Sequence, residues 1–243
     1  MQNLVKVEYL KLRHTFGGKI LVIAPCVMLM LSLVLAPGNS FAAGAWNWWY
    51  ALFLSGTLSI ACYLSVKKDR KIRYQNLLLL DIPPQRSWNG KILYCAGGLL
   101  ISNSILYLGT LLGGAVFGTS IPDFGGLAAV FLLTASYLWE IPLFLFLSAR
   151  FGMFPSIFAG ILLSNIGILT APKYAFWWIC PAAIPPRLMC SVLGLLPNGL
   201  PAPAESLLNS TNVILPGIFL SMVWFLAADA ATSAWFAHWE EKV

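Results

Sequence analysis

Long apolar runs separated by short polar segments form the main pattern along this chain. Six of these runs are long enough to cross a membrane as helices. They cover residues 20–36, 46–66, 92–117, 125–148, 153–170 and 213–235. They are far longer than the roughly ten residues of a barrel strand, and they lack the two-residue alternation of such strands. The pattern therefore predicts an all-α integral membrane protein with six transmembrane helices.

Residues 2–16, which precede the first run, mix apolar and charged side chains. Leu4 and Val7 lie among Lys6 and Glu8, a mixture typical of a helix that lies in the membrane interface. Small residues after the first run resemble a signal-peptide cleavage site, but the polar leader is longer than a secretory one and includes an acid. We therefore expect an N-terminal interfacial helix and a first run that is retained.

Aromatic residues gather at the start of the second run. Trp46, Trp48, Trp49 and Tyr50 fall within five positions, and Trp and Tyr are enriched where a span meets the membrane surface. This cluster predicts an interfacial aromatic belt.

The third run carries small residues at a spacing that favours close packing. Gly109 and Gly113 are four residues apart, and Gly114 and Gly118 repeat this spacing, which lets two helices approach closely. The spacing leaves open whether the partner helix belongs to this chain or to a second subunit.

The segment between the fifth and sixth runs, residues 172–211, differs in kind. Prolines recur from Pro172 to Pro203 in a sequence that is still apolar and aromatic. Proline prevents a continuous spanning helix, whereas so much apolar surface argues against a solvated loop. We expect broken extracytoplasmic helices that lie in the outer interface or re-enter the membrane. Cys180 and Cys190 share this segment, as a disulfide or as two buried thiols.

Basic residues are concentrated on one side of this layout. Of the fifteen Lys and Arg residues, seven lie in residues 67–91, whereas only Lys173 and Arg187 fall in predicted outer segments. The positive-inside rule then places the 67–91 loop and both termini in the cytoplasm. This topology accounts for the net charge of +6 without a nucleic-acid partner.

The basic loop contains a stretch without Gly or Pro, residues 72–81, which is followed by Pro83 and Pro84. It predicts a short helix of about 15 Å, too short to span a bilayer. Such a helix would rest on anionic lipid headgroups or dock into a protein groove. Four adjacent leucines, residues 77–80, slightly favour the groove, because a helix that is apolar on most sides needs cover on most sides.

Motifs for nucleotide, metal or acid–base chemistry are missing from the sequence. The segment GGKI at 17–20 lacks the earlier Gly and the Ser or Thr of a phosphate-binding loop. The two histidines, His14 and His238, lie at predicted cytoplasmic ends, and the five cysteines have no metal-ligand spacing. We therefore expect no catalytic, cofactor or metal site in this chain, and no ATP hydrolysis by it.

Two acids, Glu140 and Asp229, fall inside predicted spans, where a carboxyl is costly and marks a functional candidate. They would attract a cationic substrate or carry protons, or else serve packing as protonated or hydrogen-bonded groups. With Trp177 and Trp178 they form a candidate substrate path. An intramembrane hydrolase or lipid transferase using both acids would need polar residues that converge at one depth. Both acids are expected toward the inner ends of their spans, so depth alone does not exclude such an enzyme, but these spans offer no His or other nucleophile partner.

Several motifs resemble one family of transporters. They are NWWY at 47–50, KKDRK at 67–71, IPPRLMC at 184–190 and LPNGLP at 196–201. Together with the six spans, the leader and the basic loop, they resemble the permeases of type-2 ABC exporters, and more specifically the lantibiotic immunity subfamily. The likeness covers essentially the whole chain, residues 1–243, as a single permease domain.

The resemblance implies a permease in the bacterial cytoplasmic membrane that expels cationic lantibiotic peptides from the membrane lipid. It implies two kinds of partner, a cytoplasmic ABC ATPase dimer that binds ATP and Mg²⁺ and a second related permease or a second copy. It also implies a coupling helix on the ATPase, carried by Arg70, Lys71, Arg73, Tyr74, Leu77, Leu78 and Asp81. Two alternatives remain, an energy-independent immunity protein or sensor that binds such peptides, and an exporter of another amphiphile.

Overall fold

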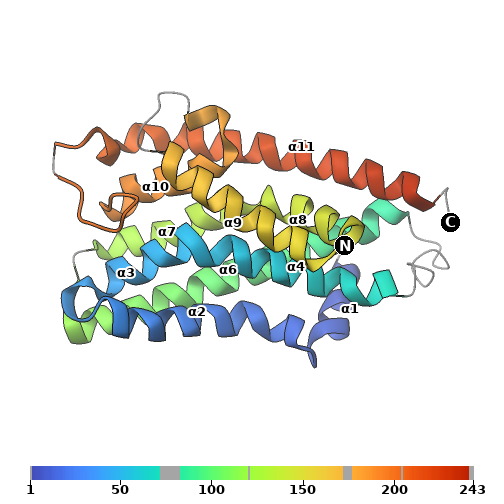
Figure 1. Cartoon of the computed structure of the whole chain (residues 1–243), viewed down its shortest axis with the longest axis horizontal. Coiled ribbons are helices and arrows are strands. Elements are labelled where there is room, and N and C mark those ends of the chain that lie inside the picture. Colours follow the sequence, from blue (N-terminus) through green and yellow to red (C-terminus); the bar gives the residue numbers. More distant parts are fainter. Residues whose placement is uncertain (1, 72–82, 120, 172–176, 204, 241–243) are drawn as a thin grey trace.

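Helices account for nearly all of the chain that the structure describes. The computed structural model describes residues 2–71, 83–119, 121–171, 177–203 and 205–240. The long helices run roughly parallel in one elongated bundle (Figure 1). The α-helices are α1 (Gln2–Leu12), α2 (Phe16–Leu35), α3 (Phe41–Trp48), α4 (Leu54–Lys71), α6 (Pro84–Phe117), α7 (Asp123–Tyr137), α8 (Glu140–Arg150), α9 (Met153–Thr170), α10 (Ile184–Leu193) and α11 (Ile214–Glu240). The short 3-10 helices are η1 (Gly38–Ser40), η3 (Trp177–Ile179), η4 (Pro181–Ala183), η5 (Leu207–Asn209) and η6 (Thr211–Val213), and η2 (Trp49–Phe53) is a π-helix.

Five helical segments in the described residues are long and apolar enough to cross a membrane, and a bent pair makes up to six. The five are α2, the continuous run Gly38–Lys71, α6, α9 and the run Thr211–His238. The bent pair is α7 and α8, whose axes meet at 46°. The prediction of an all-helical protein is therefore confirmed for the described residues, and the five or six long apolar helices are compatible with a membrane protein.

The aromatic cluster at the start of the second span does not form an interfacial belt, which corrects the sequence prediction. Trp46, Trp49 and Tyr50 are at most 1% exposed, and only Trp48 is open, at 42%. Their cover comes from distant helices, since the Trp49 indole donates a hydrogen bond to Asn103 on α6 (2.9 Å). These rings therefore belong to the packed core of the bundle.

Small residues on α6 pack against α2 and α3 of the same chain. A side chain at Gly98 would overlap Leu21, one at Gly109 would overlap Leu29, and one at Gly113 would overlap Phe41 on α3. The close packing predicted from the spacing is confirmed, and its partners lie within this subunit.

The basic loop is shorter than the predicted 67–91. Helix α4 runs on to Lys71, and α6 begins at Pro84 rather than at residue 92. Proline suits the first turn of a helix, because its missing N–H needs no partner there and its fixed φ is already helical. The predicted helix over 72–81 lies outside the described residues. The last turns of α4 and α11, the first turn of α6 and the whole of α1 lie at the same end of the bundle (Figure 1).

At the opposite end, short helices replace a continuous span between α9 and α11, as the prolines predict. We call residues 177–203 and 205–213 the outer segment, after the side of the membrane that the sequence predicts for them. Cys180 and Cys190 are free thiols here rather than a disulfide. Burial raises the pKa of the Cys190 thiol to about 11.

Candidate functional site

Four charged side chains from three helices meet at the end of the bundle that carries the basic loop. We call Glu8, Lys11, Asp69 and Lys91 the charge cluster. Lys91 is fully buried, and its ammonium donates hydrogen bonds to Glu8 on α1 (3.1 Å), to the Asp69 carboxylate on α4 and to the carbonyl of Ser65 (3.3 Å). A buried ammonium is stable only when carboxylates and carbonyls surround it in this way.

Lys11 completes the charge cluster from its more open side. Its ammonium lies 2.8 Å from Glu8 and 3.4 Å from both oxygens of Asp69. Burial lowers the pKa of Lys11, but the two carboxylates outweigh burial and the pKa ends above its ordinary value. Two cations therefore balance two anions, and both helices that flank the basic loop are tied to α1.

Sequence reasoning missed the charge cluster, because it assigned Lys91 to a solvated loop. Two of the seven predicted coupling residues are described by the structure, and both lie close to this cluster. Arg70 and Lys71 occupy the last turn of α4, whereas Arg73, Tyr74, Leu77, Leu78 and Asp81 lie outside the described residues. Arg70 packs over the turn between α8 and α9, since a Cβ at Gly152 (φ +105°) would lie 2.9 Å from its guanidinium.

A second polar site lies near the middle of the bundle, where two helices depart from regular geometry. Glu140 is buried at the first position of α8, directly after the 46° bend from α7. Its carboxylate accepts a hydrogen bond of 2.7 Å from the hydroxyl of Ser55. Ser55 comes two residues after the π-helical turn η2, and such turns are frequent at functional sites.

The surroundings of Glu140 leave it one hydrogen-bond donor and no cationic partner among the residues that the structure describes. The nearby Tyr137 hydroxyl donates instead to the carbonyl of Tyr50 (2.7 Å). A buried carboxyl in this setting can bind a proton or pair with a cation that enters the bundle. Both are consistent with its predicted place in a substrate path.

Replacing Ser55 with alanine tests how much the Glu140 carboxyl depends on its donor. We expect Ser55→Ala to lower the free energy of unfolding by about 1–3 kcal/mol, because it leaves a buried acceptor unpaired. Ser59→Ala, one turn along α4, is the control: its buried hydroxyl donates to the Gly56 carbonyl of its own helix (2.8 Å). Thermal unfolding of both variants in detergent gives the comparison, and equal losses would contradict the expectation.

Asp229 lies near the level of the charge cluster. Its carboxylate accepts a hydrogen bond from Ser233 (2.9 Å), whose hydroxyl also contacts Asn89, two residues before the cluster lysine. Glu140 is bonded at Ser55, and the fourteen residue steps of α4 from Ser55 to Asp69 correspond to about 21 Å of helix. The two acids therefore lie at different depths, whereas a hydrolase using both would need them at one depth.

Trp177 and Trp178 lie in the outer segment, away from both acids. Their rings are stacked, with centroids 4.2 Å apart. The outer segment contacts α9 at Gly167, seven residues beyond the level at which Gly160 packs on Ser55, which corresponds to about 10 Å of helix. The four residues of the predicted substrate path thus occupy three levels and do not form one site.

Arg187 holds the outer segment together. It is buried, and its guanidinium donates hydrogen bonds to the carbonyls of Leu208 (2.6 Å) and Leu207 (3.0 Å) and lies 5.8 Å from the Trp177 ring centroid. Burial lowers the pKa of Arg187. This outer cation therefore cross-links two short helices rather than facing solvent.

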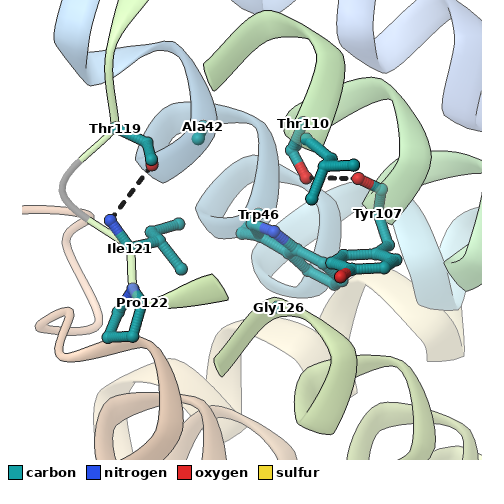
Figure 2. Close-up of a pocket in the computed structure, with 9 residues that line it drawn as sticks. Ala42, Trp46, Tyr107, Thr110, Thr119, Ile121, Pro122 and Gly126 are labelled. Carbon is teal, nitrogen blue, oxygen red and sulfur yellow. Dashed lines mark hydrogen bonds between the residues drawn. The ribbon is translucent and has the colours of Figure 1, made fainter. Parts of the chain in front are cut away.

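Figure 2 shows a small cavity between α3, α6 and α7. Trp46 of α3 and Tyr107 of α6 line the cavity, and Thr119, Ile121 and Pro122 line it as well. The Ile121 amide donates a hydrogen bond to the Thr119 hydroxyl (3.1 Å) beside the cavity. With a volume of ≈ 30 Å³ the cavity has room for one or two water molecules and none for a peptide.

The chain matches no protein-family model, and no curated protein or solved structure matches it significantly.

Proposed function

We propose that this chain is the permease subunit of an ATP-driven exporter that expels cationic antimicrobial peptides of the lantibiotic class. It acts in the bacterial cytoplasmic membrane with six spans, the bent pair α7 and α8 counting as one, and with both termini in the cytoplasm. The observation that carries the proposal is the charge cluster. It ties α1 to both helices that flank the basic loop, which suits a loop that receives a mechanical input.

The partners follow from the same proposal. The chain supplies no nucleotide-binding motif, so ATP and Mg²⁺ bind to a separate cytoplasmic ATPase dimer. Arg70 and Lys71 mark the described edge of the surface that docks on it. A second related permease, or a second copy of this chain, completes the transporter.

The proposed mechanism runs from the loop to the outer segment along α4. Movement of the docked loop shifts α4 and α6 as a unit, because Lys91 joins them through Asp69. Helix α4 packs against α8 at the Glu140 site and against α9 at Gly160, so its shift reaches the outer half of the bundle. There the outer segment, cross-linked by Arg187, opens and closes the exit.

Co-purification tests the proposal directly. The tagged chain is expressed with its neighbouring genes, purified in nanodiscs, and its partners are identified by mass spectrometry. We expect an ABC ATPase, and with it a second permease or a second copy of the chain. Protection of cells from a cationic lantibiotic should disappear when the catalytic glutamate of that ATPase is changed to glutamine. Recovery of the chain alone, with protection that needs no ATPase, would contradict the proposal and favour a peptide-sequestering immunity protein.

A charge reversal at the end of α4 gives a residue-level version of this test. Lys71→Glu should lower the recovered ATPase by roughly fivefold or more, because it reverses a charge at the proposed dock. Lys67→Glu is the matched control, since it makes the same change one turn nearer the membrane, where the Lys67 ammonium lies 6.0 Å from the Tyr63 ring centroid. Equal recovery from both variants would remove Lys71 from the docking surface.

A further inference from the structure

A groove runs along the outside of the bundle between α1, α2 and α6. It has a volume of ≈ 640 Å³, and most of its exposed lining is apolar. We call it the inner groove, since it begins at the end of the bundle that carries the basic loop. Its lining residues are Val5, Lys6, Tyr9, Gly18, Leu21, Val22, Leu93, Tyr94, Gly97, Gly98 and Ile101.

Two adjacent glycines of α6 have opposite surroundings in the inner groove. A Cβ at Gly98 would overlap Leu21 of α2, so Gly98 is needed for the packing of these two helices. A Cβ at Gly97 would meet nothing within 4 Å. Packing within the chain therefore does not explain Gly97, whose missing side chain keeps the groove open.

The inner groove has the length of one acyl chain within one leaflet. Its lining on α6 extends from Leu93 to Ile101, a rise of eight residue steps or about 12 Å of helix. One leaflet of a bilayer contributes roughly 15 Å of hydrocarbon. At the far end of its α6 lining, Ser102 follows the lining residue Ile101 and donates a hydrogen bond to the carbonyl of Leu21.

The charge at the mouth of the inner groove is positive and uncompensated. Lys6 lies on the rim and is exposed, and Lys19 is exposed directly after the lining residue Gly18. Neither lysine forms an ion pair with the residues that the structure describes, whereas the nearby acids Glu8 and Asp69 are already bound by the cluster lysines.

We propose that the inner groove binds an anionic glycerophospholipid of the inner leaflet. One acyl chain lies along α6 over Gly97, and the phosphate lies at Lys6 and Lys19, beside the rim residue Tyr9. An amphiphile with an anionic head and a single-leaflet tail matches both the charge of the mouth and the length of the groove. This inference requires membrane insertion but does not depend on an ATPase partner.

Filling the groove is the first arm of the test. The protein is purified in detergent, mixed with equal amounts of palmitoyl-oleoyl phosphatidylglycerol and palmitoyl-oleoyl phosphatidylcholine, and its bound lipids are counted by native mass spectrometry. Gly97→Leu should reduce bound phosphatidylglycerol more than tenfold, since it displaces several buried methylenes. Gly56→Leu is the matched control, because a Cβ at Gly56 also meets nothing within 4 Å and lies on α4. It should leave binding unchanged.

Removing the rim charge is the second arm, which does not depend on how the leucine variant folds. The unaltered protein should retain phosphatidylglycerol over phosphatidylcholine, and Lys6→Gln should reduce this preference by about fivefold, the contribution of one lysine at an anionic surface. Equal retention of the two lipids by the unaltered protein would overturn the proposal. So would unchanged lipid binding in Gly97→Leu, or a loss of self-association in that variant without a loss of lipid.

Discussion

Lys91→Met is expected to destabilise the protein by about 3–5 kcal/mol, because it leaves two buried carboxylates with only one ammonium. Glu8 and Asp69 lie within 3.4 Å of Lys11 in the unaltered protein, and that residue alone cannot neutralise both. The loss should appear as a lower thermal midpoint and a lower yield of folded protein in detergent. Lys67→Met changes an exposed lysine of α4 at the same end of the bundle, and it should alter neither the midpoint nor the yield.

A compensating change separates charge imbalance from lost packing. Asp69→Asn combined with Lys91→Met leaves Glu8 and Lys11 as a balanced pair, 2.8 Å apart. We expect the double variant to recover most of the stability that Lys91→Met loses, since replacing a whole buried ion pair costs far less than removing one partner. A double variant as unstable as Lys91→Met would show that the lysine acts through its contacts and not through its charge.

The charge cluster also shows why hydropathy placed the spans but not the ends of their helices. Hydropathy follows the average polarity of a run of residues. The third predicted span therefore starts at residue 92, where the apolar run begins. The helix itself begins at Pro84, outside the apolar run. Counted from there, Lys91 falls in the stripe of buried positions that includes Trp88, Cys95 and Leu99, at the three- and four-residue spacing of a helix. The helical spacing therefore predicts that Lys91 is buried, once α6 is taken to begin before the apolar run.

The Glu140 site could be named from the sequence but not assembled. An acid within an apolar run is a visible signal, and it marks Glu140 as a functional candidate. Its donor Ser55 is 85 residues away and follows a π-helical turn that no residue pattern announces. The same limit explains why the prediction of an aromatic belt is wrong. Composition shows that Trp49 suits a membrane interface, but it cannot show that α6 covers this residue.

Glycines on α6 and α9 carry different kinds of information. The spacing of Gly109 and Gly113 predicted a close helix contact, and the structure identifies α2 and α3 as its partners. Gly167 on α9 stood out in no pattern, because the element that it contacts is a short 3-10 helix and not a long one. Close approach of irregular backbone to a helix leaves no periodic trace in the sequence.

Gly167→Ala is expected to cost about 3 kcal/mol or more, because a Cβ there would overlap the carbonyl oxygen of Ala182 and lie 2.9 Å from its carbon. Both atoms are backbone of η4, which leads directly into the buried helix α10, so α10 must move outward. At roughly 2–4 °C for each kcal/mol, the thermal midpoint should fall by about 6 °C or more. Gly97→Ala is the matched control, and it should match or exceed the unaltered midpoint, since alanine favours a helix and meets nothing within 4 Å. Equal midpoints for the two variants would mean that the outer segment does not rest on α9. A selective loss in Gly167→Ala would show that the outer segment packs on α9 at this glycine.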